Sequence, residues 1–165
     1  MLALSGTALV GCTPEAEPSP TPTAAFASEE EAFAAAEETY RGYIAAFNNV
    51  DLQDPRTFEP VFDFTTGDYQ STEREQLSEM NAEGYIRGGA IEVVSFEGLE
   101  TTSTTISART CEDVSSTTFT DKSGVSLVPP DRANHVAQDV VFTVVDGRPL
   151  LSSAMSIEDA SCVTG

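Results

Sequence analysis

The chain has 165 residues, and its 27 acidic against 8 basic residues give a formal net charge of −19 at pH 7. This length suits one domain with a single hydrophobic core, and a hydrophobic content of 40% excludes a wholly disordered chain. The basic residues are scattered, whereas phosphate binding needs clustered cations, so nucleic acid is excluded as a partner and direct adsorption to anionic lipid headgroups is opposed.

Residues 1–11 are small or apolar and are too few to span a bilayer, which needs ~20 residues. Their length matches the apolar core of a secretory signal peptide. Such signals open with a basic residue, but neither Lys nor Arg precedes Cys12. We therefore expect residues 1–11 to be a signal peptide whose true start lies upstream of Met1.

The segment Leu9-Val10-Gly11-Cys12 resembles the lipobox of bacterial lipoproteins. In that family the cysteine thiol is acylated with diacylglycerol, and cleavage makes this cysteine the first mature residue. The resemblance implies lipidation at Cys12 and a location on the outer face of the cell membrane, because lipid chains supply the anchoring that a short apolar segment lacks. The alternative is an ordinary buried cysteine after a frayed terminus.

A spacer follows the lipobox. Thr13 to Ala27 contains four of the nine prolines together with Ser, Thr and Glu, and it has no apolar period. Such a composition stays extended and solvated. We expect residues 12–27 to be a lipidated cysteine with a disordered tether, and residues 28–165 to form a single domain.

The cysteine count adds a prediction about the domain. Three cysteines leave one unpaired in an exported protein. If Cys12 is lipidated, Cys111 and Cys162 remain as a pair in an oxidising compartment. We expect a disulfide between them that holds the C-terminal tail against a strand.

Three helices are predicted at the start of the domain. Ser28 and Glu31 form a capping box, and apolar residues then recur at helical spacing up to residues 48–49. A short helix restarts at residues 54–55, with Asp as the cap and Pro in the first turn, and closes at residues 66–67. A third helix should cover residues 68–83 and end at Gly84, with three residues facing inward: Tyr69, Leu77 and Met80.

The hydrophobic period then changes from helical spacing to alternation. Strands are predicted over residues 90–96, from Thr104 through Cys111 towards Phe119, over residues 136–145, and over residues 150–157. Asp146-Gly147 is a strong hairpin signal between the last two strands. This order predicts an α+β protein in which three N-terminal helices pack on a curved four-stranded antiparallel sheet.

The same order of elements resembles the nuclear transport factor 2-like, or cystatin-like, cone fold. Residues 111–115 (CEDVS), 120–124 (TDKSG), 130–132 (PDR) and the Asp-Gly turn resemble small lipoproteins and envelope proteins of high-GC Gram-positive bacteria. Proteins of this fold bind small apolar ligands in the cone, catalyse isomerisation or hydrolysis there, or serve as interaction modules. The fold by itself does not select among these functions.

Candidate site residues are few. Asp63 lies between two phenylalanines, and Asp139 shares a strand face with valines, although Arg109 across the sheet is an alternative partner for it. Both carboxyls are weak catalytic candidates. A ligand site is suggested by three tyrosines, which at helical spacing would otherwise be plain core: Tyr43, Tyr69 and Tyr85.

No ligand set for a metal and no cofactor motif stands out in the sequence. The lone His135, at a strand entrance, is more typical of a solvated residue than of a catalytic one.

Two functions follow as hypotheses. The first is a membrane-anchored, extracytoplasmic and non-enzymatic lipoprotein domain that binds a small apolar ligand or an envelope protein. The second is a cone-fold enzyme of the isomerase or hydrolase type that uses Asp63 or Asp139 with a nearby tyrosine.

Overall fold

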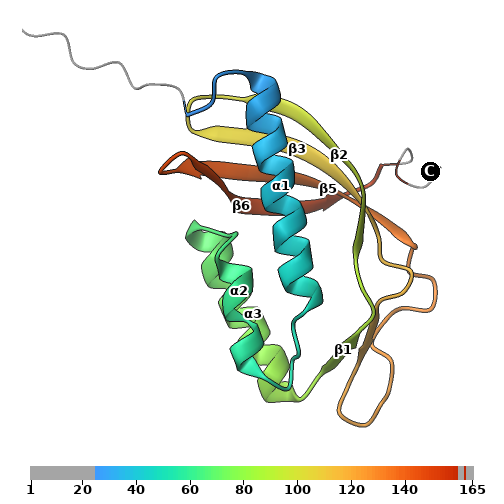
Figure 1. The fold of residues 1–165 in the computed structure, drawn as a ribbon. Helices are drawn as coiled ribbons and strands as arrows, with labels where there is room; N and C mark the ends of the chain where they lie inside the picture. The colour runs from blue at the N-terminus through green and yellow to red at the C-terminus, as the bar shows by residue number, and fades with distance from the viewer. Residues whose placement is uncertain (1–24, 160–161, 163–165) are drawn as a thin grey trace, which may run out of the picture.

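The computed structural model describes residues 25–159 and Cys162 (Figure 1). The predicted signal peptide, the Cys12 lipidation point and most of the predicted tether lie outside these residues. The helical elements are α1 (Glu29–Asn48), the 3₁₀ turn η1 (Pro55–Thr57), α2 (Glu59–Phe62) and α3 (Gly67–Glu83). The strands are β1 (Ile86–Gly88), β2 (Glu92–Thr101), β3 (Thr105–Asp113), β4 (Thr118–Thr120), β5 (His135–Val145) and β6 (Arg148–Ile157).

The helices pack on one face of a curved antiparallel sheet, as Figure 1 shows. The strand order is β2-β3-β5-β6, so neighbours in the sheet are also successive long strands of the chain. Helix α1 contacts β2, β3 and β6, while α3 contacts β6. The predicted α+β architecture of helices on a four-stranded antiparallel sheet is confirmed.

The local sequence explains where the helices begin and end. The Ser28 hydroxyl accepts a hydrogen bond from the Glu31 backbone N–H at 3.1 Å, and three glutamates occupy the first turn of α1. Asp54 caps η1 by accepting from the Arg56 N–H at 3.1 Å. Helix α3 ends at Gly84, whose φ of 75° is left-handed and therefore favours glycine.

The hairpin between β5 and β6 follows from its two turn residues. Asp146 has a φ of 50° and Gly147 a φ of 78°. Two successive positive φ values are those of a type I′ turn, which suits the twist of the flanking strands. The turn places Val145 opposite Arg148, and this pairing starts the register between β5 and β6.

The predicted strand from Thr104 to Phe119 was wrong in its second half. Strand β3 ends at Asp113, whose carboxylate accepts a hydrogen bond from the Ser115 N–H at 2.7 Å and turns the chain. Residues 118–120 then form β4, which pairs with the unpredicted β1 in a separate two-stranded sheet. The strand predicted over residues 90–96 starts at Glu92 and extends to Thr101.

The core lies between α1 and the inner sheet face. The side chains of Ile106, Ala108, Val140, Phe142 and Leu151 are all 0% exposed. On the opposite face, Cys111 and Cys162 form the disulfide that the cysteine count indicated, with Cα atoms 5.4 Å apart. No helix within the described ranges has the length and apolarity needed to cross a membrane.

Candidate functional site

A polar cluster lies inside the cone, between α1 and the middle of the sheet. The Tyr40 hydroxyl on α1 donates a hydrogen bond to the Glu112 carboxylate on β3. Gln138 on β5 donates from Nε2 to the other Glu112 oxygen at 3.0 Å, and the Thr110 hydroxyl lies 3.4 Å from the Tyr40 oxygen. Tyr40 is 1% and Glu112 2% exposed, so these polar groups satisfy one another away from water.

A second buried carboxyl belongs to Glu73 on α3. The Tyr43 hydroxyl donates to Glu73 Oε1 at 2.7 Å, and the Tyr69 hydroxyl lies 3.2 Å from that of Tyr43. The other oxygen of Glu73 is buried and has no hydrogen-bond partner among the described residues. Tyrosines from α1 and α3 therefore line up along the inside of the cone with a glutamate at each end of the series.

Burial dominates the electrostatics of this cluster. Loss of water raises the pKa of Glu73 and of Glu112, although hydrogen bonds from tyrosine hydroxyls act in the opposite direction. Burial, followed by repulsion from Glu73, raises the pKa of Tyr69 to about 12. The tyrosines therefore remain protonated donors at neutral pH, as the carboxyl oxygens they face require.

The residues predicted from sequence are only partly brought together. Tyr43 and Tyr69 meet, whereas Tyr85 packs edge-on against Phe119 with ring centroids 5.1 Å apart. Asp63 is exposed at the end of α2. Asp139 faces away from the tyrosines, as described next.

Asp139 is held by an arginine on the neighbouring strand. Arg109 donates to its two carboxylate oxygens at 2.8 and 3.2 Å. Arg109 and Asp139 lie on the outer face of the sheet, whereas Tyr40 and Tyr43 lie on the side of the inner face. The alternative reading of Asp139 as an ion-pair partner of Arg109 agrees with this geometry.

Sequence reasoning missed Glu73 and Glu112, although each carried a signal. Glu73 lies four residues after Tyr69 and four before Leu77, on the buried face of α3. Glu112 continues the alternation of Ala108 and Thr110 along β3. A charged residue at a position where the helical or strand spacing predicts a buried side chain is therefore the signal that would have found both glutamates.

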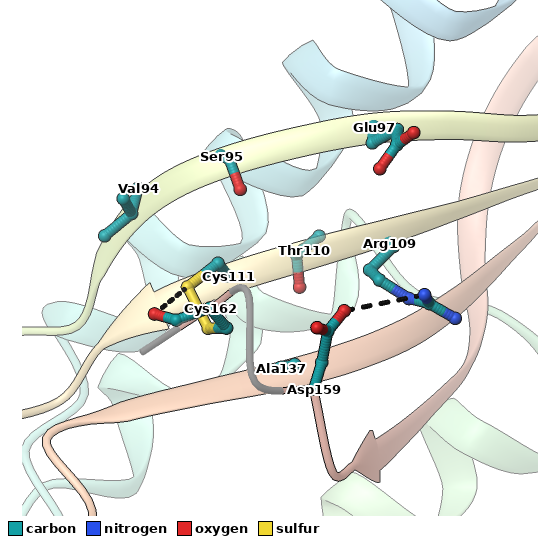
Figure 2. A pocket seen from close by; sticks show the side chains of 9 residues that line it. All are labelled: Val94, Ser95, Glu97, Arg109, Thr110, Cys111, Ala137, Asp159 and Cys162. Carbon is teal, nitrogen blue, oxygen red and sulfur yellow. Dashed lines mark hydrogen bonds and ion pairs between the residues drawn. A yellow bond between two sulfur atoms is a disulfide. The ribbon is translucent and has the colours of Figure 1, made fainter. Parts of the chain in front are cut away.

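A polar hollow lies on the outer sheet face, next to the disulfide (Figure 2). Its volume is about 210 Å³. Arg109 also approaches Asp159 at 3.5 Å, so this arginine joins two carboxylates, those of Asp139 and Asp159. Figure 2 shows that these groups and the disulfide join the C-terminal segment to the sheet. The contacts around this hollow therefore attach Asp159 and Cys162 to the sheet.

An apolar groove is lined by residues near the C-terminal ends of α1 and α3 and by residues of β1 and β4. Its volume is about 330 Å³. Its walls are mostly apolar, and five of the apolar lining residues come from different elements or linkers: Phe47, Met80, Ile91, Phe119 and Val136. Neither Glu73 nor Glu112 lines this groove, so the space for a ligand that the groove offers is separate from the cluster in the cone.

Two arginines interrupt the apolar lining of the groove. The guanidinium carbon of Arg87 lies 4.8 Å from the centre of the Phe47 ring, and Nη2 donates to Asn48 Oδ1 at 3.1 Å. Arg132 donates to the Thr117 hydroxyl at 2.8 Å and to the Val114 carbonyl at 2.6 Å.

The described residues hold no cluster of three or more His, Cys, Asp or Glu side chains able to bind a metal ion.

Comparisons with known proteins show the fold. No protein-family model matches the chain, and no curated protein matches it. A candidate aromatic ring hydroxylase from Novosphingobium aromaticivorans is 14% identical, with a TM-score of 0.54 over 79% of this chain and 96% of that one. The intermembrane-space region of the chloroplast protein ARC6 is 12% identical, with a TM-score of 0.53 over 77% of this chain and 97% of that one.

The chain shares its fold with these two proteins, with helices packed on a curved four-stranded antiparallel sheet. At these identities the likeness carries the architecture alone, because one cone supports unrelated activities. The function must therefore be argued from the groove and the buried cluster of this chain.

Proposed function

We propose that the protein is a small-molecule binding module, held by a lipid on Cys12 at the outer face of the cell membrane. The observation that carries the binding part is the apolar groove, with a volume of about 330 Å³, at one end of the cone. Small-ligand sites are concave, mostly apolar and marked by a few polar groups, which is the character of this lining. An envelope protein is the other partner class that the sequence allowed, but a hollow of this size suits a small molecule better.

The alternative is acid–base chemistry by a carboxylate of the cone. Asp63 is exposed and Asp139 is paired with Arg109, so neither is placed to act on a substrate held near the tyrosines. Glu73 and Glu112 are buried beside tyrosines, but packed side chains surround them. General acid–base catalysis needs a group within hydrogen-bond reach of a bound substrate. The geometry therefore favours binding over catalysis.

The anchor part of the proposal is supported by the sequence Leu9-Val10-Gly11-Cys12 and the proline-rich segment after it. Diacylglycerol on the cysteine would hold the domain at a membrane that the chain, with its formal net charge of −19, would otherwise avoid. Intact-mass analysis of the mature protein tests this, with Cys12→Ala as the control. An unmodified native product that is released freely from cells would refute the anchor.

The binding part is tested with Nile red, a neutral apolar dye that fluoresces when it leaves water. We expect the dye to bind the wild-type protein and to bind Val136→Phe at least tenfold more weakly, because the larger side chain fills the groove. Val145→Phe is the matched control, since Val145 is exposed at the other end of the same strand. Equal binding by both variants would exclude the groove as the site.

A further inference from the structure

We propose that the ligand of the groove is an amphipathic anion, whose oxyanion head group is bound by Arg87 while its apolar body lies along the groove. The inference rests on the proposed function and specifies the class of ligand. A carboxylate and a phosphate ester share the chemistry required of the head. Arg132 lines the same groove and adds a second positive charge to it.

The charge distribution of the chain is the first argument. Acidic residues outnumber basic ones by 27 to 8, and four of the arginines form ion pairs with carboxylates: Arg41, Arg56, Arg74 and Arg109. Arg87 and Arg132 line one groove, and neither has a carboxylate partner within residues 25–159. Two partly buried cations left without an anion, in so acidic a chain, are complementary to an anion from outside.

The hydrogen bonds of the two arginines divide their roles. Arg132 uses Nη1 and Nη2 to bind the turn between β3 and β4, through the Thr117 hydroxyl and the carbonyls of Val114 and Thr117. The guanidinium of Arg87 makes a single hydrogen bond among the described residues, to Asn48 Oδ1. A guanidinium offers five N–H donors, so Arg87 retains donors for a bidentate oxyanion.

The setting of Arg87 holds these donors in place. The guanidinium stacks on the Phe47 ring and donates a hydrogen bond to Asn48. Because these contacts already restrict the Arg87 side chain, it loses little conformational freedom when an anion binds. The side chain of Arg87 is partly buried, and this burial lowers the pKa of its guanidinium. A charge in that setting attracts an oxyanion more strongly than an exposed one does.

The apolar part of the groove completes the recognition. Met80, Phe119 and Val136 lie on the same hollow as the arginines, so an aliphatic or aromatic body can be buried beside the head group. The volume of about 330 Å³ lies near the lower end of the range for small-molecule sites, which favours a short amphiphile.

The experiment compares octanoate, octyl phosphate and octan-1-ol by isothermal titration with the full chain. We expect the better of the two anions to bind at least about tenfold more tightly than the alcohol, since a charge-assisted hydrogen bond favours the anion. Arg87→Gln should remove this advantage and leave octan-1-ol binding unchanged. The preferred anion identifies the head as a carboxylate or a phosphate.

Arg148→Gln is the matched control, because it removes the same charge from an exposed position outside the groove. Arg87→Lys keeps the positive charge but loses the planar pair of guanidinium donors, so it should retain part of the preference for the anion over octan-1-ol. This variant also provides the test if Arg87→Gln does not fold. Equal binding of anion and alcohol, or an anion preference that survives Arg87→Gln, would overturn the inference and leave the proposed function standing. Binding of none of the three compounds would instead overturn the proposed function.

Discussion

The Tyr40 hydroxyl on α1 donates a hydrogen bond to the Glu112 carboxylate on β3, so a polar contact joins helix and sheet inside the core. Both side chains are almost fully buried, and Gln138 satisfies the second carboxylate oxygen. This contact adds a directional link between α1 and β3 to the apolar packing of the core. The buried cluster is therefore a structural feature with consequences that can be measured.

Tyr40→Phe should destabilise the protein by about 1–3 kcal/mol, because it leaves a buried Glu112 oxygen without its donor. Urea unfolding followed by circular dichroism measures this change. Tyr85→Phe is the matched control, since no hydrogen bond of the Tyr85 hydroxyl is found within the described residues, and it should change the free energy of unfolding by less than about 0.5 kcal/mol. Equal losses for the two variants would contradict the role given to Tyr40.

Glu73→Gln should make the protein more stable at neutral pH. Burial raises the pKa of Glu73 above its ordinary value of 4.5, so the folded state binds its proton more tightly than the unfolded state does. For that reason, the free energy of unfolding of the wild-type protein falls as the pH rises from 4.5 through the raised folded-state pKa. A neutral glutamine keeps an acceptor for Tyr43 and removes this dependence.

The measurement is the free energy of unfolding from pH 4 to pH 8 for the wild-type protein and the variant. The two curves should converge at the acidic end and separate as the pH rises. Glu75→Gln, an exposed substitution on the same helix, corrects for the loss of one charge from an acidic chain. A constant difference between Glu73→Gln and Glu75→Gln at every pH would disprove the prediction.

Gly98→Ala should destabilise the protein, although alanine is ordinarily better than glycine within a strand. The Phe33 ring from α1 lies directly on Gly98 of β2, and a Cβ atom there would collide with the ring. We expect a loss of about 1–3 kcal/mol in urea unfolding. The collision disappears when Phe33 is replaced by alanine. In the Phe33→Ala variant, Gly98→Ala should therefore lower the free energy of unfolding far less. Simple additivity of the two substitutions would show that the contact is unimportant.

Reduction of the disulfide between Cys111 and Cys162 should lower the free energy of unfolding by about 4 kcal/mol, since the bridge closes a loop with a sequence separation of 51. Urea unfolding with and without a reductant measures the loss. In the Cys111→Ala/Cys162→Ala variant the reductant should have no effect. Reaction of both cysteines with a thiol reagent under denaturing, non-reducing conditions would refute the bridge.

Several elements were predictable because their signals are local. The capping box at Ser28, the left-handed stop at Gly84 and the Asp146-Gly147 turn each depend on residues a few positions apart. Alternation and helical spacing then determine which side of each element is apolar. The order of helices and strands follows from those signals, and it leaves few arrangements besides helices on a meander.

The short strand β1 and its partner β4 were not predictable in this way. Each has three residues, too few for alternation to show, and their paired residues lie 30 to 34 positions apart in the chain. Their pairing brings Arg87 beside Phe119 and so forms one side of the groove. A site assembled from ends of elements has no local signature.

The sequence by itself therefore determined the α+β class, the order of the long elements, the hairpin and the cysteines available to pair. The tertiary structure alone decided that Asp63 and Asp139 lie outside the cone while Glu73 and Glu112 lie inside it. It also decided that two arginines far apart in the chain share an apolar groove. The physical reason is desolvation, because the environment of a charge depends on side chains that other elements bring to it, and no spacing along the chain encodes that proximity.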